Sequence, residues 1–205
     1  MKETFEAFAV FFAGVLLDTW RAAYRAANRE LWAAYSRGEI DRHFLHEQRF
    51  AIPFAQLGLD PGRAKEVGAF YFLAYRRHWR LNEGATEILE DAARLGIAGI
   101  VSNGFFETQK GKIARFRLER FLSHVILSEE VGCMKPGRAI FDAAVTASGA
   151  AAGVRKLYIG DSLEHDVFGA KSAGWLPVLY NPSGATVPAP VMYVKRLVDL
   201  KPLLE

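Results

Sequence analysis

The hydrophobic residues of this chain follow one pattern up to about residue 82 and another beyond it. Between Asp18 and Asn82 the apolar positions recur at steps of three and four, as on one face of an amphipathic helix. This spacing is clearest in Trp20, Tyr24, Ala27, Leu31 and Tyr35. A second helix is predicted over residues 44–57. A third is predicted to run to Tyr75, with Asp60 as its N-cap and Pro61 in its first turn.

After Gly84, short apolar runs alternate with helical segments, which is typical of a parallel sheet covered by helices on both faces. The predicted strands lie near residues 97–101, 124–127, 156–159 and 177–180, and the predicted helices over residues 85–95, 108–117, 139–148 and 166–173. An earlier apolar run, residues 8–12, is interpreted as the first strand of the same sheet.

These patterns predict an α/β fold, a Rossmann-like doubly wound parallel sheet with an inserted all-α helical cap. Residues 1–18 and 83–205 would form the α/β core, and residues 19–82 the cap that follows the first strand. A chain of 205 residues suits one domain with a sizeable insertion.

The ten-residue apolar run at 8–17 is too short to cross a bilayer, and Glu3 and Glu6 precede it where a signal peptide would be basic.

Composition narrows the possible partners only slightly. Hydrophobic residues make up 51% and charged residues 24% of the chain, as in an ordinary globular protein. The net charge of +3 suits anionic small molecules without indicating nucleic acid. Basic clusters at residues 76–80 and 110–120 are expected to be solvated helix faces, with phosphate steering or nucleic-acid binding as the alternative. The single cysteine, Cys133, excludes an intrachain disulfide, and we expect a cytoplasmic protein without nucleic-acid or membrane partners.

Three polar motifs come after apolar runs. Ser102-Asn103-Gly104 follows the first run after Gly84, Lys135-Pro136 follows the second, and the segment from Gly160 to Asp166 follows the third. Open α/β sheets bind their ligands at the carboxyl ends of the strands, so the three motifs are expected to meet there.

The residue types in these motifs suit phosphoryl chemistry. The Ser102 hydroxyl and the backbone N–H groups of Asn103 and Gly104 could hold phosphoryl oxygens, and Lys135 could supply a fixed positive charge. Each motif taken alone is also a common turn or loop. The carboxylates of Asp161 and Asp166 could face one Mg²⁺, and Asp166 could also cap the helix that follows.

In their order and spacing these motifs resemble those of the haloacid-dehalogenase superfamily of phosphohydrolases. The resemblance implies that Ser102 and Lys135 bind the phosphoryl group, that Asp161 binds Mg²⁺ and that Asp166 supports the metal site. More narrowly, the chain resembles the bacterial pyrimidine and noncanonical-nucleotide 5′-nucleotidases. The segments that carry this narrower resemblance are Asn28-Arg29-Glu30-Leu31-Trp32, Tyr35, Gly38, Arg49-Phe50, residues 127–132, Met134-Lys135-Pro136 and Ile140-Phe141.

One feature departs from the family. Its members carry Asp-x-Asp after the first strand, where the first aspartate attacks phosphorus and the second acts as acid and base. This chain reads Phe12-Ala13-Gly14-Val15, as if both aspartates had been removed around Ala13. Asp18 is too far along to replace them. A natural pseudoenzyme, an engineered deletion and a recorded sequence short of two residues would each explain the gap, and the otherwise intact motifs favour an active parental enzyme.

Two functions therefore remain open. The first is Mg²⁺-dependent hydrolysis of a small phosphomonoester, possibly a nucleoside 5′-monophosphate, through an aspartyl-phosphate. The second is a catalytically inactive protein that binds a phosphorylated metabolite or a protein partner. Halide release from a 2-haloacid fits less well, because it needs the same missing nucleophile and has no use for an Mg²⁺ pair.

Overall fold

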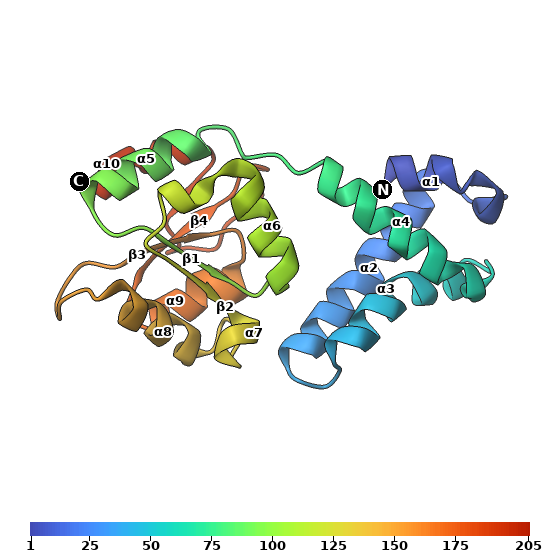
Figure 1. Cartoon of the computed structure of the whole chain (residues 1–205), viewed down its shortest axis with the longest axis horizontal. Coiled ribbons are helices and arrows are strands. Elements are labelled where there is room, and N and C mark those ends of the chain that lie inside the picture. Colours follow the sequence, from blue (N-terminus) through green and yellow to red (C-terminus); the bar gives the residue numbers. More distant parts are fainter. The chain divides into compact units, whose positions relative to one another are not determined.

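A computed structural model describes all residues, 1–205, and divides the chain into two compact units, Met1–Arg80 and Leu81–Glu205 (Figure 1). The first unit is entirely helical, as the sequence predicts for residues 19–82. Its elements are α1 (Lys2–Ala7), the 3₁₀ turn η1 (Ala9–Phe12), α2 (Leu17–Ser36), α3 (Arg42–Gln56), the 3₁₀ turn η2 (Pro61–Arg63) and α4 (Ala64–Arg77).

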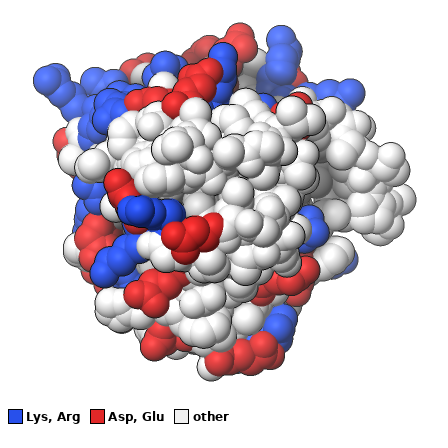
Figure 2. Space-filling model, turned by 90° about the vertical axis from the view of Figure 1, so that its right-hand side faces the viewer, with Lys and Arg blue, Asp and Glu red and all other residues white.

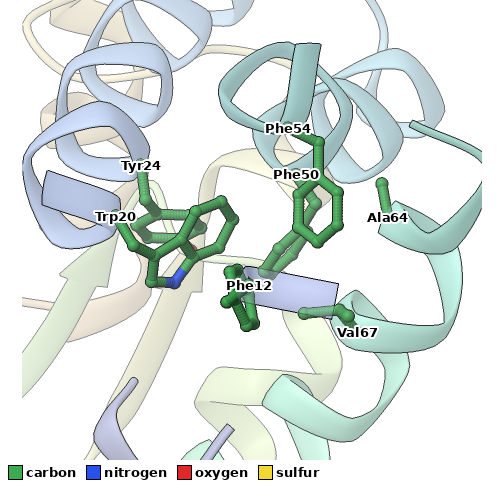
Figure 3. Packing of buried hydrophobic residues seen from close by; sticks show 7 residues of the cluster. All are labelled: Phe12, Trp20, Tyr24, Phe50, Phe54, Ala64 and Val67. Atoms are coloured by element: carbon green, nitrogen blue, oxygen red, sulfur yellow. The ribbon is translucent and has the colours of Figure 1, made fainter. Parts of the chain in front are cut away.

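The helical unit is held together by an aromatic core (Figure 3). Trp20 and Tyr24 of α2 meet Phe50 and Phe54 of α3, and the Trp20 and Phe54 rings pack edge to face with centroids 5.2 Å apart. Ala64 and Val67 close this core from α4. The prediction that Asp60 is an N-cap is confirmed, because its side chain accepts a hydrogen bond from the Gly62 N–H at 2.9 Å.

The prediction of a strand over residues 8–12 is wrong. Residues Ala9–Phe12 form a 3₁₀ turn, and Phe12 is buried beside Trp20 and Phe54 in the helical unit. The physical reason lies in the spacing of the aromatic residues. Phe5, Phe8 and Phe12 are three and four positions apart, so one helical face can bury them as well as a strand could. Residues 1–18 therefore lie in the helical unit, whereas the sequence pattern predicts them in the α/β core.

Charged side chains also hold helix α1 against the end of α4. The Glu3 carboxylate accepts hydrogen bonds from the Arg77 guanidinium and lies 2.7 Å from the His78 ring at the end of α4. The His78 and Arg77 side chains hold the pKa of Glu3 below its ordinary value of 4.5.

We expect acid to loosen α1. Because the Glu3 pKa is lower in the folded protein, its contribution is complete above pH 4.5 and is lost as the pH falls through the folded-state pKa. The protection of the α1 amides against hydrogen exchange, taken relative to their intrinsic exchange rate at each pH, should therefore fall below pH 4.5 in the parent chain. Glu3→Gln should show fast exchange at neutral pH already, and exchange that is equally slow in both chains at pH 7 would contradict the tie.

The second unit has the predicted alternation of helices and parallel strands. Its elements are α5 (Ala85–Leu95), β1 (Gly99–Ser102), α6 (Phe106–Phe116), η3 (Leu118–Arg120), β2 (His124–Leu127), α7 (Ser128–Val131), α8 (Arg138–Ser148), β3 (Leu157–Gly160), the π-helical turn η4 (Leu163–Phe168), α9 (Gly169–Ser172), β4 (Leu176–Tyr180), β5 (Tyr193–Val194), η5 (Leu197–Leu200) and α10 (Lys201–Leu204). Every strand pair is parallel.

Strand β3 shows that helices cover both faces of the sheet. Leu157 and Ile159 pack in a cluster with Ile88 of α5, while Tyr158 between them packs with Phe141 of α8. Successive side chains of a strand point to opposite faces, so the two clusters lie on opposite sides (Figure 1). The doubly wound α/β fold is thus confirmed.

The strands form two sheets, one with the order β1-β2 and one with the order β3-β4-β5. Val101 and Ile126 of the first sheet join Tyr158 of the second in one hydrophobic cluster, so both sheets belong to one packed unit. The Tyr158 hydroxyl also donates a hydrogen bond to the Val101 carbonyl oxygen at 3.2 Å. A side chain, rather than a backbone ladder, therefore links β1 to β3.

On the face drawn in Figure 2, Lys, Arg, Asp and Glu lie mostly around a broad uncharged area. The helical unit exposes several large apolar side chains, namely Val10, Leu16, Phe44 and Leu73. No helix of the structure has both the length and the apolarity needed to cross a bilayer.

Candidate functional site

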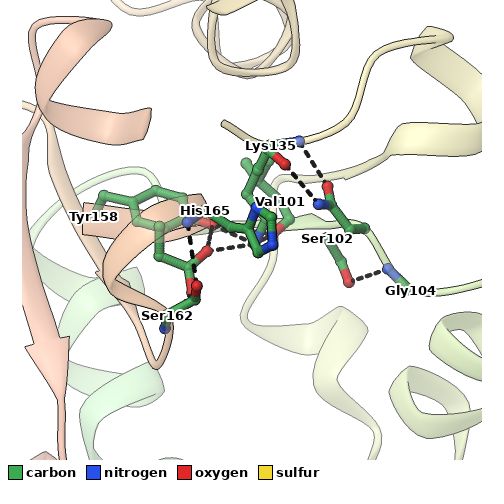
Figure 4. A network of polar contacts seen from close by, with 9 residues as sticks. Val101, Ser102, Gly104, Lys135, Tyr158, Ser162 and His165 are labelled. Atoms are coloured by element: carbon green, nitrogen blue, oxygen red, sulfur yellow. Dashed lines mark hydrogen bonds and ion pairs between the residues drawn. The ribbon is translucent and has the colours of Figure 1, made fainter. Parts of the chain in front are cut away.

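The site is organised around the ammonium group of Lys135. Its Nζ donates to the Asp166 Oδ1 at 2.6 Å, the Tyr158 hydroxyl at 2.9 Å and the Val101 carbonyl oxygen at 3.1 Å (Figure 4). An ammonium group has three hydrogens, so these partners use all of its donors. The Lys135 and Asp166 side chains are only 12% and 5% exposed, and the ion pair is therefore largely shielded from water.

Asn103 fixes the backbone of the lysine loop. Its Nδ2 donates to the Lys135 carbonyl oxygen at 2.9 Å, and its Oδ1 accepts from the Lys135 N–H at 2.8 Å. Ser102, one residue earlier, accepts a hydrogen bond from the Gly104 N–H at 3.0 Å through its Oγ. The Ser102 hydroxyl proton takes no part in that bond and can be donated to a ligand. The structure thus brings the first two sequence motifs together and gives the Asn103 side chain a positioning role.

Asp166 connects the third motif to the lysine. Its Oδ1 accepts a hydrogen bond from the Lys135 Nζ, and its Oδ2 accepts one from the Ser162 N–H at 3.0 Å. The helix after β3 begins at Leu163, and its N-cap is Ser162, whose Oγ accepts from the His165 N–H at 3.1 Å. The alternative role of Asp166 as the helix cap is therefore wrong, because Ser162 fills that position and Asp166 lies inside the first turn.

Gly160 makes the approach of Asp166 possible. A Cβ placed on Gly160 would lie 2.3 Å from the Asp166 Cγ and 2.4 Å from its Oδ2, closer than nonbonded atoms can come. The sequence signal was the Gly160-Asp161 pair at a strand end, where a glycine often marks the close approach of another group.

We expect Gly160→Ala to destabilise the α/β unit by about 2 kcal/mol, since it pushes Asp166 off Ser162 and Lys135 and weakens hydrogen bonds to a charged group. Gly96→Ala is the matched control, because a Cβ there meets nothing within 4 Å and its backbone is extended. Thermal unfolding of both variants checks this. An equal, small change in Tm would contradict the close approach.

Tyr158 belongs to the site although no sequence motif indicates it. Burial, with the nearby Asp166 charge adding to it, raises the pKa of this phenol well above its ordinary value, so the hydroxyl keeps its proton. It can therefore accept from Lys135 while donating to the Val101 oxygen. A tyrosine in an apolar strand is usually core, but its position two residues before Gly160 placed it on the glycine's face of the strand.

Asp161 is the exposed carboxylate of the site. It follows the tip of β3 and lies at the edge of an open hollow. No cluster of three or more His, Cys, Asp or Glu side chains in the structure could hold a metal ion by itself. Mg²⁺ commonly keeps several water ligands and takes one or two carboxylates together with substrate phosphate oxygens, so Asp161 with Asp166 behind it fits that ion.

The nucleophile position is the part that the structure does not supply. Ala13 belongs to the helical unit, in a tight turn closed by a hydrogen bond from the Val15 N–H to the Phe12 carbonyl oxygen at 2.9 Å. Asp166 cannot replace the missing aspartate, because both of its oxygens already accept hydrogen bonds and it is 4% exposed.

Comparisons with known proteins agree with this site. Residues 2–174 match the sequence profile of the haloacid dehalogenase-like hydrolases. The chain is 31% identical over 185 residues to the pyrimidine 5′-nucleotidase YjjG of Escherichia coli, a match that covers 88% of this chain and 80% of that one. It is 32% identical over 155 residues to a phosphoserine phosphatase of Thermus thermophilus, covering 73% of this chain and 61% of that one.

Among solved structures, the hydrolase YfnB of Bacillus subtilis, determined with bound magnesium, shares the fold with a TM-score of 0.80 and 23% sequence identity. That likeness covers 99% of this chain and 88% of YfnB. The profile match spans more than half of the chain and includes the lysine and aspartate motifs that meet around Lys135. The chain belongs to the haloacid dehalogenase-like hydrolase family, among relatives that include phosphatases and nucleotidases.

Proposed function

We propose that the α/β unit binds the phosphoryl group of a small phosphomonoester together with Mg²⁺, and that the site is built for hydrolysis of that ester in the cytoplasm. The observation that carries the proposal is the meeting of Lys135, Ser102 and Asp166 at the carboxyl ends of parallel strands. The likeness to YjjG, a pyrimidine 5′-nucleotidase, supports a nucleoside 5′-monophosphate as the substrate.

Each residue has a role that its geometry suits. The Ser102 hydroxyl would donate a hydrogen bond to a phosphoryl oxygen, and Lys135 would neutralise part of its charge after exchanging one internal partner for the ligand. Asp161 would hold Mg²⁺, with Asp166 supporting the loop through Ser162. The metal, when bound, supplies charge neutralisation at the phosphate.

The 205-residue chain favours a second function, binding without turnover. The observation is specific: alanine and glycine stand where the family has its nucleophile, and Asp166 is buried with both oxygens occupied. A protein with an intact anion site and no attacking carboxylate would bind a phosphorylated metabolite and release it unchanged.

The test begins with the intact mass of the purified protein, which establishes whether two aspartyl residues are present. Binding of inorganic phosphate and of uridine 5′-monophosphate is then measured calorimetrically with and without Mg²⁺, and phosphate release is followed. Phosphate should bind more tightly with Mg²⁺, and Ser102→Ala and Asp161→Asn should weaken binding about tenfold or more. Gly96→Ala is the control. Absence of phosphate binding in the parent chain would refute the proposal.

A further inference from the structure

A hollow adjoins the phosphate site and is lined in part by Asp161. It has a volume of about 530 Å³ and opens at the carboxyl ends of β3 and β4, wholly within the α/β unit. Its lining residues are Asn82, Ile159, Gly160, Asp161, Tyr180, Asn181, Pro182, Ser183 and Leu197. Lys135 and its partners are not among them, and the volume lies within the range of about 300 to 1,000 Å³ that small-molecule sites occupy.

The lining excludes some ligands by charge. No Lys, Arg or His contributes to it, and its one ionisable carboxylate is that of Asp161. No cation of the lining could pair with an anionic group, and Asp161, when it holds Mg²⁺, directs that charge to the phosphoryl group rather than to a second anion. Ile159, Pro182 and Leu197 supply apolar surface, and Asn82 and Ser183 supply an amide and a hydroxyl. Such a mixture suits a neutral ring that carries hydroxyl groups.

The part of the lining formed by Asn181 and Ser183 is held in place by hydrogen bonds within the protein. Asn181 is 8% exposed, and its Nδ2 donates to the Ala185 carbonyl oxygen at 2.7 Å. The Ser183 hydroxyl donates to the Asn181 Oδ1 at 3.0 Å, and the Gly184 N–H donates to the Asn181 carbonyl oxygen at 3.1 Å. The Asn181 N–H donates to Val194 of β5 at 2.8 Å. Little ordering is therefore required on binding, which favours affinity.

We propose that this hollow is the subsite for the pentose ring of the substrate, with the Asn82 amide and the Ser183 hydroxyl contacting its hydroxyl groups. The inference rests on the proposed function, because it assigns the sugar that the phosphoryl group is attached to. It adds a specificity that the phosphate site cannot provide, since Lys135 and Ser102 would contact only phosphoryl oxygens.

The experiment uses the full chain and ligands without phosphate. Uridine and D-ribose are titrated while ¹H–¹⁵N spectra of the protein are recorded. The blocking variant is Asn82→Trp, at an exposed lining position, and its matched control is Glu83→Trp, at the exposed position next to it that does not line the hollow. Inorganic phosphate is titrated into all three proteins.

Uridine and ribose should shift the amide signals of residues 180–184, Asn82→Trp should weaken this binding at least tenfold, and Glu83→Trp should leave it unchanged. Phosphate binding should be the same in all three proteins. Phosphate binding without any ribose or uridine binding would overturn the pentose subsite and leave the proposed function standing. Equal uridine affinity in Asn82→Trp would also overturn it. Failure of phosphate to bind the parent chain would instead count against the proposed function.

Discussion

Insertion of one aspartate on each side of Ala13 should turn the 205-residue chain into a Mg²⁺-dependent phosphatase. We expect the lengthened segment to leave the 3₁₀ turn of the helical unit and to place its first aspartate at the strand ends of the α/β unit, where Ser102 and Lys135 lie. The insertion gives Phe12-Asp-Ala-Asp-Gly-Val, the order in which the family carries its nucleophile and its acid–base residue. Removing the nucleophile from an enzyme of covalent mechanism leaves only the contribution of binding and charge stabilisation. We expect release of phosphate from uridine 5′-monophosphate to rise by roughly 10⁴-fold.

A matched control separates chemistry from chain length. Insertion of two asparagines at the same positions restores the length and much of the shape of this segment without a carboxylate. It should bind phosphate and show no turnover above the parent chain. Equal activity of the asparagine and aspartate chains, or no activity of the aspartate chain while its phosphate binding is intact, would contradict the role assigned to these positions.

In the native site the donors of Lys135 are already occupied by groups of the protein, and this affects how strongly the site can bind an anion. All three donors of Lys135 are used within the protein, and Asp166 is neutralised by it at 2.6 Å. A phosphate ligand must therefore displace a carbonyl or a hydroxyl from the ammonium group. Displacing Val101 loses a charge-assisted hydrogen bond to a carbonyl oxygen, worth about 1.5 to 3 kcal/mol net, which the bond between the ammonium group and a doubly charged phosphate can offset. The closed arrangement therefore weakens anion binding but does not prevent it.

Much of the α/β unit could be predicted from sequence because its elements have clear boundaries. The structure has a helix over residues 85–95 and a strand over residues 124–127, as the sequence predicts, and glycines flank the helix. The N-terminal segment was ambiguous. A short aromatic run satisfies a buried strand or one face of a helix, and the choice depends on partners distant in sequence, here Trp20 and Phe54.

The candidate site, too, has one part that the sequence predicts and another that it does not. Motif order predicted that Ser102, Lys135 and Asp166 come together, because strand ends in a parallel sheet share one edge. Tyr158 was not predicted, since only the structure shows that its hydroxyl reaches across to Val101. The hollow beside Asp161 was not predicted either. It depends on the Asn181 side chain closing the loop onto Ala185, a contact that no periodicity encodes.

The ion pair at the centre of the site leads to the second large prediction. Lys135→Met removes the charge that neutralises Asp166 and leaves a carboxylate at 5% side-chain exposure without its cation. Breaking a buried pair in this way costs about 3 to 5 kcal/mol, whereas replacing both partners by neutral groups is often close to neutral. Asp166→Asn keeps the shape of the side chain and its oxygen for the Ser162 N–H.

We therefore expect Lys135→Met alone to destabilise the α/β unit by about 3 kcal/mol or more, and the double variant Lys135→Met with Asp166→Asn to recover most of that loss. The measurement is native-state hydrogen exchange of β1 and β3 peptides, which reports on this unit separately from the helical one. Phosphate binding should be lost in both variants, because the cation is absent from each. If the double variant were no more stable than Lys135→Met, the pair would not be coupled. If Lys135→Met exchanged as slowly as the parent, Asp166 would not depend on that lysine, and the packed network drawn around it would be wrong.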